Sequence, residues 1–257
     1  KMILKKINFN SLLVLGIIPL IFSCASRKDV VYFQDASAFE TIVSDNTHTN
    51  KFKVDDVVNI HISTLDPLAS VPFNLFKGSD ESGMRPQQVD YIIDKNGEID
   101  FPVIGKIRLV GLSSEETKIL LTEKLKDYLK DPIINIRIQN FTVTVLGEVN
   151  TPGTYPVNGE QITILEAIGL ANDLTIKGKR NNVMVIRDFN GTKVYTRLDL
   201  TKKEALSSPV FYLTQNDVVY VEPNNSAIKT STLDNRASIY LSVFSLLVTS
   251  TILILRT

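Results

Sequence analysis

One stretch of the sequence decides the fold: Phe141-Thr-Val-Thr-Val-Leu-Gly-Glu-Val-Asn-Thr-Pro-Gly-Thr-Tyr-Pro156. Its apolar residues Phe141, Val143 and Val145 occupy every second position, which is the pattern of a strand with one buried face. Gly147 interrupts the pattern. The stretch therefore predicts a strand that ends in a bulge or in a close approach of another backbone.

A turn and a return strand follow. Asn150-Thr-Pro-Gly153 is typical of a tight turn in which proline presets φ and Gly153 supplies a positive φ. The return strand begins at Thr154, and this pair of strands needs a helix to cover its apolar face. Thr163-x-x-Glu166 predicts the capping box of that helix. Its buried stripe is predicted at Leu165, Ile168 and Leu170.

The other strands of this second unit are predicted at 182–188, 193–198 and 211–223, with a turn at Asn190-Gly191 between the first two. Strands favour aromatic residues for packing alone, but aromatic rings also stack on sugar rings. Both interpretations apply to four tyrosines of the unit: Tyr155, Tyr195, Tyr212 and Tyr220.

The residues before this stretch predict a first, separate unit. It opens with a turn at Asp55-Asp56 and a strand to residue 63 whose apolar residues occupy every second position. His61 falls on the opposite side of that strand and is interpreted as a solvated residue, because no second histidine lies near it. Residues 66–88 contain prolines and glycines and predict a loop excursion.

A hairpin and a helix complete the first unit. Asn96-Gly97 predicts the hairpin over 90–103, and 104–111 continues the sheet. Ser113-Ser-Glu-Glu116 predicts the capping box of a helix, and a strand at 134–138 follows it, so the unit is α+β. The buried stripe of the helix is predicted at Ile119, Leu121, Leu125, Tyr128 and Leu129.

The N-terminus has the pattern of an export signal. Two lysines precede a short apolar run at 9–22 that ends in Ser23-Cys24, as in secretory signal peptides. Ser23-Cys24 resembles the bacterial lipobox, so residues 1–23 are predicted to be a signal peptide and Cys24 the site of lipid attachment. The alternative is a short buried helix with an incidental cysteine. The polar residues after Cys24 predict a tether with a short strand or anchor at 30–33.

The C-terminus predicts a second membrane attachment. Residues 237–255 carry no charge and span roughly 28 Å as a helix, close to the hydrocarbon thickness of a bilayer. A single transmembrane helix is predicted, with a buried soluble helix as the alternative. Small polar residues recur on one face of it, as helix–helix contact in lipid requires. This face, a pore lining or a packing surface, comprises Ser238, Ser242, Ser245 and Thr249.

The order of these motifs resembles one family. Phe52-x-Val-x-Asp-Val-Val-x-Ile, then Ile93-Asp-x-x-Gly-x-Ile-x-Phe-Pro-x-Ile-Gly-x-Ile-x-Leu-x-Gly111, then Asp131-Pro132 before a strand are similar to bacterial polysaccharide export outer-membrane lipoproteins. The second unit resembles the soluble-ligand-binding β-grasp (SLBB) domain of that family. The chain departs from the family where Gly-Asp is usual, at Asp55-Asp56 and Asn216-Asp217, and where Gly-Gly is usual, at Asn172-Asp173.

The resemblance implies an α+β chain with a small export domain followed by a β-grasp-like domain. The predicted segments are a signal peptide (1–23), a lipidated tether (24–50), a polysaccharide export domain (51–138), an SLBB domain (139–223), a linker (224–236) and a transmembrane helix (237–255).

Composition and motifs argue against other classes. The 28 basic residues balance 28 acidic ones, unlike the basic surplus of most nucleic-acid binders. No nucleophile–base set, phosphate loop or metal-ligand spacing is present in the sequence, so no catalytic residue, metal or other cofactor is predicted. The sequence does not indicate which residues would contact a polysaccharide ligand.

The resemblance implies a ring-shaped homo-oligomer that exports capsular or exopolysaccharide across the periplasm and outer membrane. Each subunit is expected to be lipid-anchored in the outer membrane with most of its chain in the periplasm. An inner-membrane polysaccharide co-polymerase is the implied partner. The alternative is a lipid-anchored periplasmic module that binds or tethers glycan without forming a pore.

Overall fold

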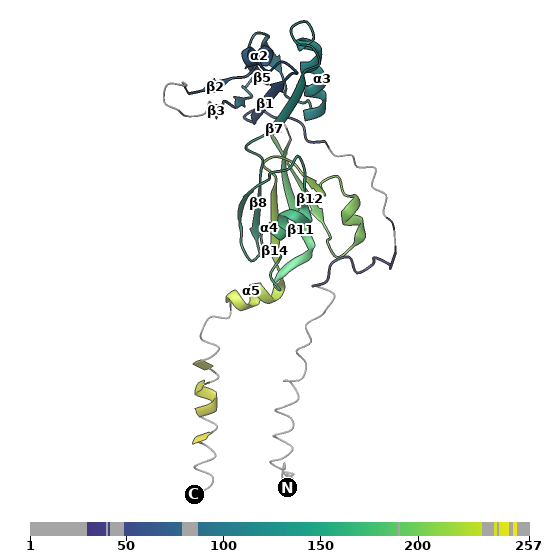
Figure 1. Ribbon diagram of the computed structural model, residues 1–257. Helices are drawn as coiled ribbons and strands as arrows, with labels where there is room; N and C mark the ends of the chain where they lie inside the picture. The colour runs from purple at the N-terminus through teal and green to yellow at the C-terminus, as the bar shows by residue number, and fades with distance from the viewer. Residues whose placement is uncertain are drawn as a thin grey trace, which may run out of the picture.

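The computed structural model describes residues 30–39, 41, 49–78, 87–189, 191–232, 239–240, 242–246 and 249–250. Two units of mixed helix and sheet follow one another and meet at residues 139–141 (Figure 1). Each unit has its own cluster of buried apolar side chains, and Ile138 lies against both clusters. The predicted α+β class is confirmed.

The first unit is built on a short antiparallel sheet in the order β4-β1-β7. The central strand β1 (Val57–Ser63) pairs with β4 (Tyr91–Ile92) on one side and with β7 (Ile133–Ile138) on the other. Helix α3 (Ser114–Leu125) lies against β7. Alternate residues of β1 are buried, as predicted, and His61 is exposed.

Residues 66–78 are more regular than the predicted loop. They form α2 (Pro67–Ser70), η3 (Val71–Phe73) and β2 (Phe76–Lys77), which pairs with β3 (Gln87–Gln88). The buried side chain of Asn74 acts as a strand partner, because it accepts from the Ile62 amide at 2.9 Å and donates to the Ile62 carbonyl at 2.8 Å. The prolines and glycines of this segment predict a loop and do not indicate that Asn74 anchors it to β1.

The predicted hairpin at Asn96-Gly97 is wrong in its pairing. The turn exists, with Gly97 at φ +80°, but β4 before it pairs with β1. The strand after the turn, β5 (Glu98–Phe101), instead forms a hairpin with β6 (Gly105–Arg108). A turn sequence fixes the local bend, whereas the strand partners are chosen by burial of side chains that are distant in sequence.

Helix α3 has the predicted capping box, with Ser113 accepting from the Glu116 amide at 3.1 Å and Glu116 accepting from the Ser113 amide at 2.7 Å. The predicted stripe is wrong at Ile119 and Tyr128, which are 64% and 59% exposed. Thr117 is buried instead, because it lies on the face that Leu121 and Leu125 present to the sheet.

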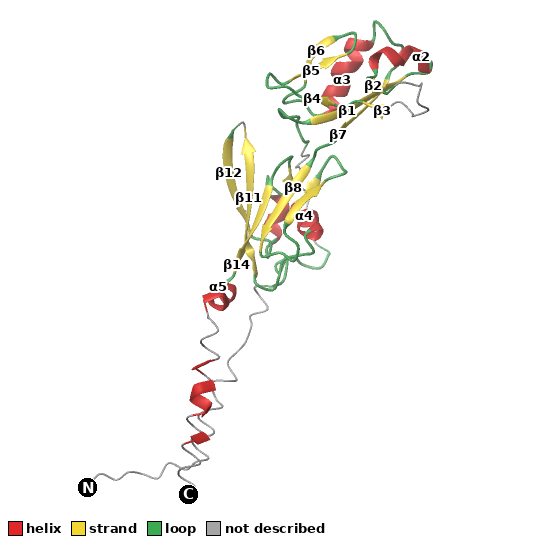
Figure 2. Ribbon diagram, turned by 90° about the vertical axis from the view of Figure 1, so that its left-hand side faces the viewer, coloured by secondary structure: helices red, strands yellow, loops and turns green. Residues whose placement is uncertain are grey.

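The second unit is a five-stranded sheet in the order β12-β11-β14-β8-β9 (Figure 2). Strand β8 (Thr142–Gly147) pairs in parallel with β14 (Val218–Pro223) and antiparallel with β9 (Gly153–Pro156). On the other side of β14 lies the hairpin of β11 (Gly178–Phe189) and β12 (Thr192–Leu198).

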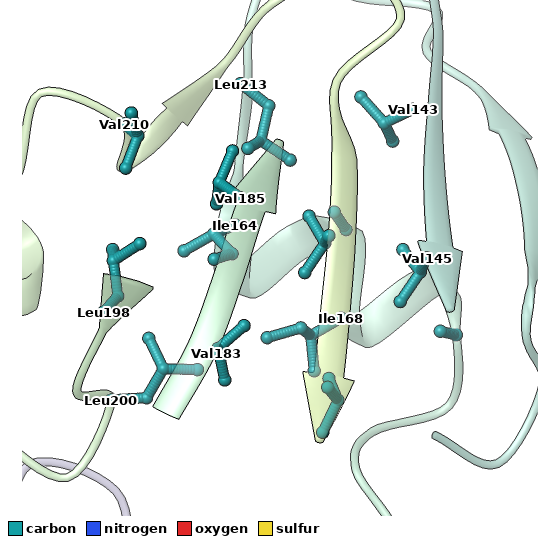
Figure 3. Packing of buried hydrophobic residues seen from close by; sticks show 14 of the residues in the cluster. Val143, Val145, Ile164, Ile168, Val183, Val185, Leu198, Leu200, Val210 and Leu213 are labelled. Atoms are coloured by element: carbon teal, nitrogen blue, oxygen red, sulfur yellow. The ribbon is translucent and has the colours of Figure 1, made fainter. Parts of the chain in front are cut away.

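Helix α4 (Ile164–Leu170) covers one face of this sheet, and Figure 3 shows Ile164 and Ile168 directed at the valines of the strands. Its capping box from Thr163 and Glu166 is confirmed. The predicted stripe is wrong at Leu170, which is 44% exposed. Beside the helix, β10 (Ile162–Thr163) pairs with β13 (Tyr212–Leu213), and η5 (Lys203–Ser207) closes the unit.

The two glycines of the deciding stretch behave differently. Gly147 has φ +92°, and a Cβ there would lie 2.1 Å from the Val221 carbonyl oxygen, so the predicted close backbone approach is confirmed. Gly153 has no positive φ and begins β9, so its predicted role in the turn is wrong. The left-handed residues after α4 are Asn172 (φ +56°) and Asp173 (φ +68°), which end the helix without glycine.

Helix α5 (Asn225–Thr232) follows β14. Among the described residues, none of the helices combines the length and apolar character needed to cross a membrane. The predicted span 237–255 lies partly outside those residues and stays a prediction.

Candidate functional site

A polar groove lies between the two units in the described part of the chain, with a volume of about 650 Å³. The start of α3, strand β7 and the loop after β9 form its walls. Asn50 crosses it by donating to the Glu160 carbonyl at 2.6 Å, and its own Oδ1 is buried without a hydrogen-bond partner among the described residues. The side chains that give it its chemistry are Asn50, Glu115, Lys118, Asn135, Gln139 and Gln161.

These amides and charges suit hydroxyl groups as hydrogen-bond partners. No aromatic side chain is present among the described residues that line the groove, so it offers no stacking platform for a sugar ring.

Two turns of the same construction, one in each unit, lie at the junction between the units. In each, a residue with left-handed φ precedes a buried aspartate: Asp55 (φ +68°) before Asp56, and Asn216 (φ +65°) before Asp217. Asp56 accepts from the Lys53 amide at 2.8 Å, as Asp217 accepts from the Thr214 amide at 2.7 Å. A strand, β1 or β14, begins directly after each aspartate.

The two turns face each other across the junction. The Lys53 ammonium donates to Thr214 Oγ1 at 3.2 Å and to the Gln215 carbonyl at 3.1 Å. Asn140, between the units, accepts from the Val57 amide at 2.9 Å and donates to the Asp55 carbonyl at 3.0 Å. Gln215 donates to the Asn140 carbonyl and accepts from the Thr142 amide at 2.8 Å, which completes the network.

We expect Lys53→Met to loosen this junction, because methionine keeps the apolar stem but removes the donor that bridges the units. The amides of Val57 and Thr142 should then exchange with solvent faster by about tenfold, which corresponds to loss of about 1.4 kcal/mol. Hydrogen exchange followed by mass spectrometry measures this. Lys95→Met, at an exposed position, is the matched control, and equal exchange in the two variants would contradict the bridging role.

The buried Asp56 carboxyl makes the junction sensitive to pH. Its side chain is 2% exposed, and burial raises its pKa from 3.8 to about 6. Burial also lowers the pKa of Lys53, the cation closest to it in the network. The folded protein therefore holds the Asp56 proton at pH values where the unfolded chain has released it.

Stability should consequently rise as the pH falls from neutrality through the folded pKa toward 5. Compared with Asp56→Asn, the wild-type protein should gain about 1.4 kcal/mol between about pH 7.5 and about pH 5. Urea unfolding at the two pH values measures this difference. If the variant followed the same pH profile as the wild type, Asp56 would not be the titrating group.

The structure separates the four tyrosines. Tyr155 and Tyr212 pack against the buried cluster of the second unit. Tyr195 and Tyr220 lie on the opposite face of the sheet, where the register places Tyr195 beside Ile186 and Tyr220 beside Met184 and Leu146. Tyr195 is 62% exposed. Alternation along each strand separates its two faces, but only the register between strands shows which tyrosines share a face with Val143 and Val145.

The other predicted site residues are placed less completely. Cys24 and Ser238 lie outside the described residues. Ser242, Ser245 and Thr249 are helical and exposed, and the hydroxyls of Ser245 and Thr249 donate to the carbonyls of Ser242 and Ser245 at 2.9 and 2.6 Å. Their role in helix packing or in a pore stays a prediction. No group of three or more potential metal ligands occurs in the part of the chain that the structure describes.

Two family models match the chain one after the other. The model described as polysaccharide biosynthesis/export protein matches residues 44–139, and that of the SLBB domain matches residues 142–221. The boundary between the matches falls at Asn140, the centre of the junction network.

Two relatives are similar over the same part of the chain. The EPS I polysaccharide export outer membrane protein EpsA of Ralstonia solanacearum is 25% identical over 146 residues, which are 55% of this chain and 38% of the relative. Its namesake in Ralstonia nicotianae is 26% identical over 145 residues, 54% of this chain and 37% of the relative. The match thus spans well under half the length of these relatives.

Proposed function

The chain belongs to the polysaccharide biosynthesis/export protein family, and from this premise we propose that it is one subunit of a ring-shaped homo-oligomer that exports capsular or exopolysaccharide. The ring spans periplasm and outer membrane, and the polymer passes through its lumen chemically unaltered. The matched family is one of export proteins rather than of enzymes.

The observation that carries this proposal is the tandem of matched domains with a tightly bonded junction. The two matches cover both folded units in the order export domain, SLBB domain. The units are joined by the side chains of Lys53, Asn140 and Gln215 rather than by a free linker. Such a rigid pair suits the wall of a channel, because neighbouring copies can contact each other through both units at once.

Membrane attachment is proposed at both ends of the chain, through an acylated Cys24 and a helix over 237–255. Residues 30–35 are the first described residues after Cys24. They and helix α5 both lie at the end of the second unit remote from the first (Figure 1). This arrangement supports a subunit whose SLBB domain stands nearer the outer membrane. Metabolic labelling with a fatty-acid analogue should mark the protein, and labelling that persists in Cys24→Ser would exclude that anchor.

Native mass measurement and electron microscopy of the detergent-extracted protein test the ring directly. A closed ring of many copies is the expected result, and a monomer at working concentrations would contradict it. We further propose that an inner-membrane polysaccharide co-polymerase supplies the polymer. Cross-linking in cells, followed by mass spectrometry of the captured partner, tests that contact.

The second candidate function is a lipid-anchored periplasmic module that binds or tethers glycan without forming a pore. The exposed Tyr195 and the half-buried Tyr220 on the uncovered sheet face favour it, because tyrosine rings stack on sugar rings. A protein that stays monomeric in detergent but retains oligosaccharide on a column would support this function over the channel.

The small-residue face of the predicted span allows a prediction about export itself. Leucine at both Ser242 and Ser245 should stop the appearance of polysaccharide at the cell surface, because bulky side chains prevent close helix packing in lipid. Ser250→Leu adds the same bulk away from that face and is the matched control. Quantification of surface polymer in a complemented deletion strain gives the readout, with fractionation to verify that the variants reach the membrane. Normal export by the double variant would leave the helix as an anchor only.

A further inference from the structure

The described residues 30–35, which we call the strap, lie on the second unit although they precede the first unit in sequence. The Phe33 amide donates to the Leu200 carbonyl at 3.2 Å, and the Gln34 amide donates to the Thr201 carbonyl at 2.7 Å. The carboxylate of Asp35 accepts from the Lys203 amide at 2.8 Å, at the start of η5. A segment that precedes the first unit in sequence is therefore bound to the second unit.

The strap covers a buried cation. The side chain of Arg180 is 5% exposed, and its terminal nitrogens donate to the carbonyls of Leu174 at 3.3 Å, Thr175 at 3.3 Å and Gly178 at 3.5 Å. The nearest carboxylate, Asp173, is 3.9 Å away. Arg180 Nε is buried and has no hydrogen-bond partner among the described residues. The guanidinium is thus incompletely compensated by the second unit alone.

Tyr32 adds contacts to both members of the Arg180–Asp173 pair. Its ring centroid lies 5.2 Å from the Arg180 guanidinium carbon, within the range of a cation–π contact. Its hydroxyl donates to the Asp173 carboxylate. Burial, and then the hydrogen bond to Asp173, raise the pKa of Tyr32, so the hydroxyl stays a donor throughout the neutral range. One side chain therefore contacts both members of the Arg180–Asp173 pair.

We propose that the strap is a clamp that fastens the N-terminal segment to the second unit, with Tyr32 as the inserted residue and Arg180 with Asp173 as its receptor. The clamp fixes the point at which the N-terminal segment joins the folded body, beside η5. A pull on that segment then acts on the second unit first. Because the strap is held by few contacts along one edge, it opens more readily than the core.

Hydrogen exchange on the full-length protein in detergent tests the clamp. The amides of Phe33 and Gln34 should be protected in the wild type, and Tyr32→Ala should raise their exchange rates by about tenfold. Tyr32→Phe keeps the ring over Arg180 and loses only the bond to Asp173, so it should fall between the two. Tyr195→Ala, in the same unit but away from the strap, is the matched control and should change nothing. Open exchange of both amides in the wild type, or unchanged protection in Tyr32→Ala, would overturn the proposal.

A second pair of variants tests the receptor. Arg180→Gln removes the charge, so it should release the strap, whereas Arg180→Lys keeps the charge and should preserve part of the protection. Protection of Val183 and Val185, at the centre of the sheet, reports whether the second unit is still folded. If Arg180→Gln released nothing while these valines stayed protected, Arg180 would not be the receptor.

Cross-linking of Asp35→Cys to Lys203→Cys with a bismaleimide shows whose strap is bound. The proposal predicts an intramolecular link, and single-cysteine variants control for reaction at Cys24. A covalent dimer specific to the double variant would mean that the strap belongs to a neighbouring copy and would overturn the clamp within one chain. These readouts require neither polymer nor a channel, so their failure is distinguishable from failure of the export function.

Discussion

Replacement of Gly147 by alanine is expected to unfold the second unit or to destabilise it by at least about 3 kcal/mol. The backbone at Gly147 has φ +92°, which L-residues avoid, and the added Cβ would lie 2.1 Å from the Val221 carbonyl oxygen. That carbonyl accepts from the Glu148 amide at 3.0 Å, so it cannot move without breaking the parallel pairing of β8 with β14. Chemical unfolding followed by circular dichroism measures the loss.

Gly191→Ala separates the two causes. Gly191 has a similar φ of +83° in the turn between β11 and β12, but a Cβ there has no neighbour within 4 Å. This variant should lose only the backbone term of about 1–2 kcal/mol. If both variants lost the same amount, the close approach to Val221 would carry no energy, and the interpretation of the strand's end would be wrong.

The parts of the fold that the sequence predicts are those whose signal lies in neighbouring residues. Strand β8, the capping boxes at Ser113 and Thr163 and the close approach at Gly147 follow from residues adjacent in the chain. The partner of β4 does not, because β1 reaches it from more than thirty residues earlier in the sequence. The prediction that Ile119 is buried is wrong for a similar reason. Helix α3 packs on a sheet of only three strands, so it buries fewer positions than its pattern of apolar residues suggests.

The candidate site was less accessible from the sequence than the fold. The junction between the units forms where the side chains of Lys53, Asn140 and Gln215 meet, and each of these polar residues is unremarkable in its own segment. One signal was available: Asp55-Asp56 and Asn216-Asp217 repeat the same departure from the family pattern, each before a Val-Val strand. The parallel between the two dipeptides indicates that the two turns share one construction.

The strap shows a different limit. A short anchor at 30–33 was expected, and Tyr32 and Phe33 do pack on the protein, but without forming a strand of their own. Its receptor, Arg180, lies near the start of β11 among polar residues, and no pattern in the sequence marks it as buried. Charged residues are buried by the three-dimensional arrangement of carbonyls around them, which a sequence pattern does not contain.

The second large effect is expected at Asp217, whose carboxylate is fully buried at the end of the sheet. Arg187 donates to it through Nε at 3.0 Å and through a terminal nitrogen at 2.7 Å, and the Thr214 amide and hydroxyl donate at 2.7 and 3.0 Å. Asp217→Ala should cost about 3–5 kcal/mol, because it leaves the Arg187 charge, only 15% exposed, without its partner. Urea unfolding at neutral pH measures this loss.

Asp188→Ala is the matched control for this variant. Its carboxylate pairs with Lys193 at 2.6 Å on an exposed edge of the same sheet, where both side chains remain more than a third exposed. Exposed pairs contribute about 0.2–1 kcal/mol, so this variant should be nearly neutral. In the double variant Arg187→Met with Asp217→Ala, part of the loss should return, since no buried charge is then left unpaired. If the double variant instead lost as much unfolding free energy as Arg187→Met and Asp217→Ala lose together, Asp217 would act through the Thr214 turn alone. The ion pair would then be incidental to the junction.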